Sequence, residues 1–89
     1  MLNITESLKL SVQKITKQLF DDNEIQEYLV MAIEEYVSWN KTIDVLNFKK
    51  WLKYKVIQYA FQMLAVNSCK KEFEKKATFY RSKTAKFFE

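Results

Sequence analysis

The sequence predicts an all-α protein, a compact bundle of about four helices that forms a single domain over residues 1–89. Three observations lead to this prediction. A chain of 89 residues has room for one hydrophobic core and no second domain. It contains no glycine and no proline, on which tight hairpins and helix breaks depend. Apolar residues recur at helical spacing, and hydrophobic (48%) and charged (29%) residues together suffice for an ordered globular protein.

The first half of the chain predicts two helices. One covers about residues 5–20, and its expected buried face carries apolar residues at helical spacing: Leu8, Val12, Ile15 and Leu19. The other covers about residues 22–38, because Asp21 and Glu24 have the spacing of a capping box at its start. Its expected inner face is again apolar and comprises Ile25, Tyr28, Leu29, Ala32, Ile33 and Tyr36.

The second half predicts two further helices. The helical pattern fails between Ser38 and Leu46, where polar residues compete with the backbone for hydrogen bonds, so a loop is expected there. A third helix follows over about residues 47–67, with Asn47 as its cap. Its expected buried stripe is Phe48, Leu52, Val56, Tyr59, Met63 and Val66. A final amphipathic helix, basic on its outer face, covers about residues 70–87.

The residue types present disfavour catalysis and metal binding. There is no histidine, and the single cysteine, Cys69, has no partner for a disulfide or a thiol–imidazole pair, so a partly buried position is expected for it. A phosphate-binding glycine loop is excluded as well. We therefore expect no enzyme activity, no cofactor and no metal site. The first residues lack the pattern of a signal peptide, and no apolar run is long enough to cross a membrane, so a cytoplasmic protein is expected.

The charges divide the chain into two unlike halves. Through Asp44, four lysines stand against eight acidic residues, which gives a net charge of −4. From Val45 onward, eleven basic residues stand against three acidic ones, which gives +8. A basic field of this size attracts phosphate groups. The two halves are therefore expected to bind different partners.

A second stripe on the third helix combines aromatic residues with lysines. Lysine neutralises phosphates, aromatic rings stack on unpaired bases, and an amide can read a base edge. The alternative is that the aromatic residues are core, packed against another helix. Burial of Trp51, Tyr54 and Gln58 would mean that the DNA-binding surface as drawn is wrong. The candidate DNA-binding residues are Lys49, Lys50, Trp51, Lys53, Tyr54, Lys55, Gln58 and Phe61.

The outer face of the second helix is the candidate protein-binding surface. Apolar side chains surrounded by charged ones are a recurrent form of interface between proteins. An ordinary solvated helix face with one or two apolar residues is the alternative. The candidate partner-binding residues are Glu24, Gln26, Glu27, Val30, Met31 and Glu34.

Two segments, EIQEYLVMAIEEYVSWN and NFKKWLKYKVIQYAFQML, together resemble region 2 of the bacterial sigma-70 family of transcription initiation factors. The resemblance covers about residues 22–64. It implies that the segment from Glu24 to Glu27 docks on the clamp helices of the RNA polymerase core. It also implies that Phe48, Trp51 and Tyr54, which match the family's F-x-x-aromatic pattern, open the promoter −10 element and hold its unstacked bases.

Departures from the family pattern shape the expected function. Tyr28 replaces the usual glycine, Lys55 replaces the second of two paired tryptophans, and no helix-turn-helix for the −35 element follows. We therefore expect a transcription initiation or regulatory protein that binds RNA polymerase core and promoter DNA and needs a second small protein carrying that helix-turn-helix. The alternative is a small helical adaptor or inhibitor that binds a protein partner and no DNA. Attachment of the last helix to an anionic membrane is a third, less specific interpretation, and no membrane partner is expected.

Overall fold

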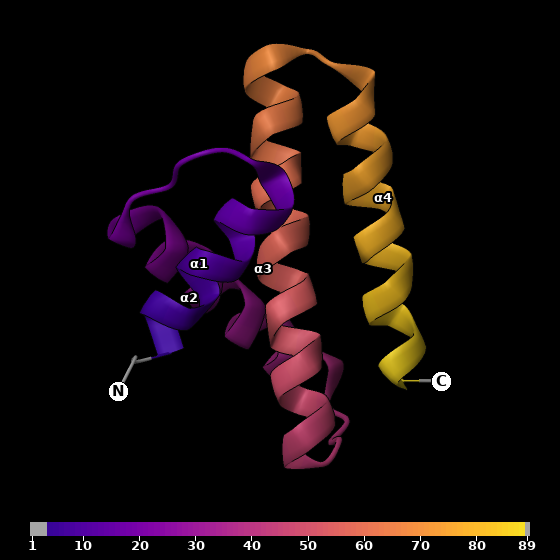
Figure 1. Cartoon of the computed structure of the whole chain (residues 1–89). Coiled ribbons are helices and arrows are strands. Elements are labelled where there is room, and N and C mark those ends of the chain that lie inside the picture. The colour runs from indigo at the N-terminus through magenta and orange to yellow at the C-terminus, as the bar shows by residue number, and fades with distance from the viewer. Residues whose placement is uncertain (1–3, 89) are drawn as a thin grey trace.

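The computed structural model describes residues 4–88 and confirms the all-α fold (Figure 1). This part of the chain contains four α-helices and a terminal 3-10 turn, and no strand. None of its helices is long and apolar enough to cross a membrane. The elements are α1 (Ile4–Thr16), α2 (Asp22–Trp39), α3 (Val45–Ser68), α4 (Lys71–Ala85) and η1 (Lys86–Phe88).

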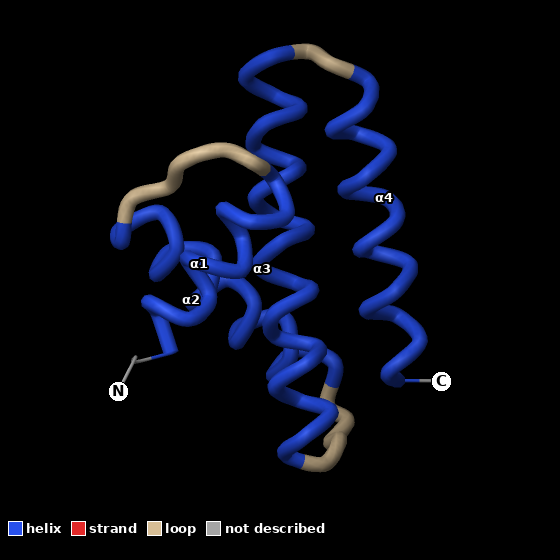
Figure 2. The backbone as a smooth tube through the Cα atoms, viewed as in Figure 1, coloured by secondary structure: helices blue, strands red, loops and turns tan. Residues whose placement is uncertain are grey.

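Helix α3 is the central element of the bundle. Helices α1 and α2 lie on one side of it, and α4 runs antiparallel along the other (Figure 1). The loops between the helices, tan in Figure 2, are short. Because α3 contacts all three other helices, it buries side chains on most of its circumference, which explains why its sequence is apolar in more than one direction. The buried core comprises Leu8, Val12, Phe20, Ile25, Tyr28, Ala32, Trp51, Leu52, Val56, Ile57, Ala60, Phe61 and Ala77.

Helix α1 ends earlier than predicted, and one expected core residue is exposed. Lys17 adopts a left-handed conformation with φ of 59°, which stops the helix after Thr16. The helical spacing therefore does not continue to Leu19, whose side chain is 88% exposed. The prediction that Leu19 is buried is wrong, and Phe20 occupies the core instead. Its ring packs edge-on against Tyr28 of α2, with 6.2 Å between centroids.

Helix α2 begins as predicted. The Asp21 carboxylate accepts a hydrogen bond from the Glu24 backbone N–H at 2.8 Å, and the Glu24 carboxylate accepts one from the Asp21 N–H at 3.3 Å. This confirms the capping box. One residue of the predicted inner face, Ile33, is 43% exposed, because α2 packs on α3 and α1 with a narrower stripe than the sequence pattern suggests.

Helix α3 differs from the prediction at both ends. It begins at Val45 with Asp44 as its cap, whose carboxylate accepts a hydrogen bond from the backbone N–H of Asn47 at 2.8 Å. The prediction of Asn47 as the cap is wrong, because Asp44 is placed to satisfy that free N–H. At the other end Met63 and Val66, predicted to be buried, are exposed. Here α3 runs past α1 and α2 and has only α4 beside it (Figure 1).

The turn between α3 and α4 is made by residues other than glycine. Cys69 closes α3 in a left-handed conformation with φ of 58°, and its backbone N–H donates to the Ala65 carbonyl oxygen. The residue is exposed, so the partly buried position expected for it is wrong. Its side chain points to solvent because the residue lies at the tip of the helical hairpin. In place of one helix over residues 70–87, the chain forms α4 and then the η1 turn.

Candidate protein- and nucleic-acid-binding surfaces

The aromatic stripe predicted to bind DNA bases is part of the core. Trp51 and Phe61 are each 1% exposed and Gln58 is 3% exposed, so the predicted exposure of these three residues is wrong. Helix α4 and η1 cover this side of α3: the Phe61 ring stacks on Tyr80 at 5.9 Å and the Trp51 ring meets Phe88 at 5.8 Å. In this structure these side chains have no surface from which to stack on an unpaired base.

Lys55, another predicted DNA contact, is also buried, and it lies in a charged cluster between α2 and α3. Its ammonium group donates hydrogen bonds to Glu35 at 2.8 Å and to Gln58 at 2.9 Å. The same Glu35 oxygen accepts the hydroxyl of Tyr59 at 2.8 Å. We call Glu35, Lys55, Gln58 and Tyr59 the junction cluster. Its members satisfy one another and hold α2 against α3 in one register.

Burial changes the acid–base behaviour of the junction cluster. It lowers the pKa of Lys55 to about 8, and the positive charge of Arg81 on α4 acts in the same direction. The carboxylate of Glu35 favours the ammonium form and opposes this decrease. Burial likewise raises the pKa of Tyr59, and the charge of Glu34 adds to the increase. Near neutral pH the cluster therefore holds a charged lysine at a free-energy cost.

The remaining predicted DNA contacts stay at the surface. Lys49 and Lys50 are exposed, and Lys53 and Tyr54 are partly exposed. The Tyr54 ring carries the Lys83 ammonium of α4 over its face at 4.3 Å, a cation–π contact. The exposed basic and aromatic side chains therefore lie outside the buried stripe, in the first turns of α3, where Tyr54 meets Lys83 of α4.

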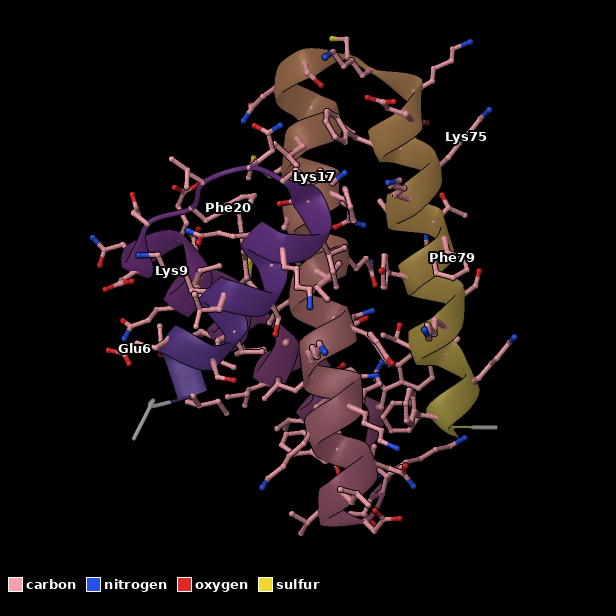
Figure 3. All side chains as sticks on the ribbon, in the orientation of Figure 1. Glu6, Lys9, Lys17, Phe20, Lys75 and Phe79 are labelled. Atoms are coloured by element: carbon pink, nitrogen blue, oxygen red, sulfur yellow. The ribbon has the colours of Figure 1, made fainter. Side chains whose placement is uncertain are left out.

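Helix α4 extends this surface with residues that the sequence patterns did not single out. Phe79 is 58% exposed, and the ammonium of Lys83 lies 5.7 Å from the centroid of its ring. Figure 3 shows Phe79 and Lys75 on α4, far from Glu6 and Lys9 of α1. We define the basic aromatic surface as Lys49, Lys50, Lys53, Tyr54, Phe79 and Lys83.

The predicted partner-binding residues of α2 lie together on its outer side. Gln26, Glu27, Val30, Met31 and Glu34 are all exposed, whereas Glu24 is partly buried and engaged in the capping box. The structure adds two apolar residues to this surface, since Ile33 and Val37 are 43% and 69% exposed. Their spacing from Val30 places all three on one helical stripe. We define the acidic apolar face as Gln26, Glu27, Val30, Met31, Ile33, Glu34 and Val37.

Comparison with protein-family models, curated proteins and solved structures finds no significant match to this chain. The functional reading therefore depends on the geometry of the surfaces themselves. The acidic apolar face lies on α2 and the basic aromatic surface on α3 and α4, so the division of charge along the sequence becomes a division between helices.

Three residues that sequence reasoning did not select become prominent in the structure: Glu35, Arg81 and Phe79. Glu35 is one of many acidic residues in the sequence, and nothing in the sequence pairs it with Lys55 on the next helix. Phe79 stood in the final helix among several aromatic residues, and only its 58% exposure distinguishes it from Phe73 and Tyr80, which pack against the core. Exposure of a single aromatic residue has no local sequence signal.

Proposed function

We propose that this protein is a regulatory binding protein that joins a protein partner on one side to nucleic acid on the other. The acidic apolar face of α2 binds the protein, and the basic aromatic surface binds phosphate groups. The resemblance to sigma region 2 supports RNA polymerase core as the protein and promoter DNA as the nucleic acid. The observation that carries the proposal is that two chemically opposite surfaces are exposed on different helices, the acidic apolar face on α2 and the basic aromatic surface on α3 and α4.

The protein-binding half of the proposal is supported by exposed apolar side chains in an acidic setting. Val30, Ile33 and Val37 form a stripe that has no cover within the described chain. Burying such groups against a partner contributes about 25 cal/mol per Å² of apolar surface. Glu27 and Glu34 border the stripe and favour a partner with a basic rim, since charge complementarity selects among apolar surfaces.

The nucleic-acid half of the proposal concerns phosphates rather than bases. Four lysines of the basic aromatic surface, Lys49, Lys50, Lys53 and Lys83, can each neutralise one phosphate. If all four do so on duplex DNA, log K falls against log salt with a slope of about −3.6. Because Trp51 and Gln58 are buried, promoter sequence would be read by a second polypeptide.

A small adaptor or inhibitor that binds only protein is the second candidate. The burial of Trp51, Gln58 and Phe61 favours it, because the side chains suited to unpaired bases are unavailable. Both candidates use the acidic apolar face, so they differ only in what the basic aromatic surface does.

Two matched pairs of variants test the proposal. Val30→Asp places a charge in the stripe of α2, and Val66→Asp makes the same change at an exposed valine of α3. We expect Val30→Asp to weaken binding to RNA polymerase core by at least about tenfold and Val66→Asp to leave it unchanged. Equal binding by the two variants would contradict the assignment of the protein-binding face.

The second pair addresses nucleic acid. Lys50→Ala with Lys53→Ala removes two charges from the basic aromatic surface, and Lys14→Ala with Lys41→Ala removes two from elsewhere. Fluorescence anisotropy with labelled duplex DNA over a salt series should show that the first pair reduces the slope of log K by about 1.8. Negligible DNA affinity of the unmodified protein at moderate salt would leave the adaptor as the function.

A further inference from the structure

A pocket lies where α2, α3 and α4 meet, next to the junction cluster. It has a volume of about 280 Å³. Its walls come from all three helices and combine charged with aromatic side chains: Glu35, Trp39, Trp51, Lys55, Arg81, Thr84 and Ala85.

The pocket carries an excess of positive charge. Lys55 and Arg81 both line it, against the single carboxylate of Glu35. That carboxylate is already engaged, because one of its oxygens accepts hydrogen bonds from both Lys55 and Tyr59 at 2.8 Å. One positive charge among the side chains that line the pocket is therefore not neutralised by the Glu35 carboxylate.

Arg81 is the unpaired member of the group. Within residues 4–88 its guanidinium has no acidic partner, whereas the buried ammonium of Lys55 is paired with Glu35. Arg81 also lies close enough to Lys55 to repel its charge. The ammonium of Lys55 has three N–H groups and two acceptors, so it retains one further donor. Two cations that repel each other across a small pocket are a favourable setting for an anion.

We propose that this pocket binds a small oxyanion, the phosphate or carboxylate group of a free ligand, between the guanidinium of Arg81 and the ammonium of Lys55. Arginine matches the geometry of both groups through paired N–H donors. The bound anion removes the repulsion between the two cations and uses the spare lysine donor. The indole rings of Trp39 and Trp51 form an apolar wall for the remainder of the ligand.

A free ligand fits better than the backbone of a nucleic acid. The side chain of Lys55 is only 7% exposed, so a phosphate must enter the pocket to reach it. A phosphate of the DNA backbone is held in a continuous polymer and remains at the surface. The site is therefore separate from the basic aromatic surface, and the inference does not depend on the proposed function.

The chain offers a direct reporter of binding. Its two tryptophans, Trp39 and Trp51, both line the pocket. Inorganic phosphate is titrated into the full-length protein at constant ionic strength, with chloride as the reference anion, and the two indole N–H signals are followed by NMR. We expect saturable shifts of both signals with phosphate and none with chloride.

Three substitutions separate the pocket from general surface charge. Arg81→Gln should weaken phosphate binding by about tenfold or more, because it removes a charged donor. Glu35→Gln should strengthen binding, because it removes the competing negative charge while retaining an acceptor for Lys55 and Tyr59. Lys75→Gln, on the same helix as Arg81 but outside the pocket, should leave the affinity within about twofold.

Several results would overturn the inference. Shifts that fail to saturate, or that appear equally with chloride, would show that the pocket has no oxyanion site. Equal losses in Arg81→Gln and Lys75→Gln would assign the effect to net charge, as would weaker binding by Glu35→Gln. The same indole signals can also be followed while an oligonucleotide is added to the protein in a buffer free of inorganic phosphate. Shifts at a lower concentration of oligonucleotide than of inorganic phosphate would assign the pocket to nucleic acid and exclude a free ligand.

Discussion

Replacing Lys55 together with Gln58, its uncharged hydrogen-bond partner, tests how the junction cluster contributes to stability. Lys55 is the one charged side chain among the buried residues of the described chain. A folded-state pKa of about 8, in place of 10.5, corresponds to roughly 3 kcal/mol of unfavourable free energy for holding the ammonium charged at neutral pH. Lys55→Met removes this cost but leaves the Gln58 carbonyl without its donor, a loss of about 1–3 kcal/mol.

The double variant Lys55→Met, Gln58→Leu avoids that loss. Glu35 then keeps the hydroxyl of Tyr59, and its side chain is 29% exposed and open to water. We expect the double variant to raise the free energy of unfolding by about 1–3 kcal/mol at neutral pH, whereas Lys55→Met alone should change it by less than about 1 kcal/mol. Lys50→Met, at an exposed position of the same helix, is the control and should have little effect.

The pH dependence of stability gives the sign of the effect. Because the folded-state pKa of Lys55 is lowered, the unfolded chain binds the extra proton between pH 8 and 10.5. The stability of the unmodified protein should therefore rise with pH across this window, and the double variant should lack the rise. Tyr28 and Tyr59 act oppositely: their raised pKa values keep them protonated in the fold, so stability is lost as pH rises above 10.

Urea denaturation followed by circular dichroism, at about pH 7 and about pH 9.5, measures both effects. The reasoning would be refuted by an unmodified protein that is no more stable at the higher pH than at the lower one. That result would mean that Glu35 stabilises the charged lysine at least as much as burial disfavours it.

Three further predictions concern the ends of the helices and can be checked by thermal or urea unfolding. Cys69→Gly should stabilise the protein by about 0.5–1 kcal/mol, because glycine adopts the left-handed conformation at the end of α3 without strain; a lower stability would contradict the assigned backbone conformation. Phe20→Ala should cost about 3–5 kcal/mol and Leu19→Ala less than about 0.5 kcal/mol, since only Phe20 is buried; the reverse order would mean that α1 continues as first predicted. Asp21→Ala should cost about 1 kcal/mol through loss of the capping box, and an unchanged unfolding midpoint would show that the cap contributes nothing.

The start of α2 and the break between α3 and α4 could be predicted because they depend on neighbours in the sequence. The capping box of Asp21 and Glu24 involves residues three apart, and it begins α2 where the pattern predicted. The break near Ser68 was likewise visible as a change of pattern. The end of α1 could not be predicted, because Lys17 carries no sequence signal for a left-handed conformation.

The two candidate surfaces also differ in how far the sequence predicts them. The acidic outer side of α2 could be predicted, since a helix that packs by one stripe exposes the opposite one. The stripe of Trp51, Gln58 and Phe61 could not, because its spacing is equally typical of core and of a binding surface. Only the position of α4 and η1 against α3 decided that these residues are buried.

The sequence alone determined that this chain is helical, roughly where its helices lie, and that its charge changes sign near Val45. These are properties of residues close together in the chain, governed by hydrogen bonding and spacing along a single helix. The tertiary structure alone decided that both apolar sides of α3 are buried, which lysines remain at the surface, and that Glu35, Lys55 and Arg81 share one junction. Those outcomes depend on how separate helices pack, and a central helix can satisfy its apolar sides in several ways until its neighbours are in place.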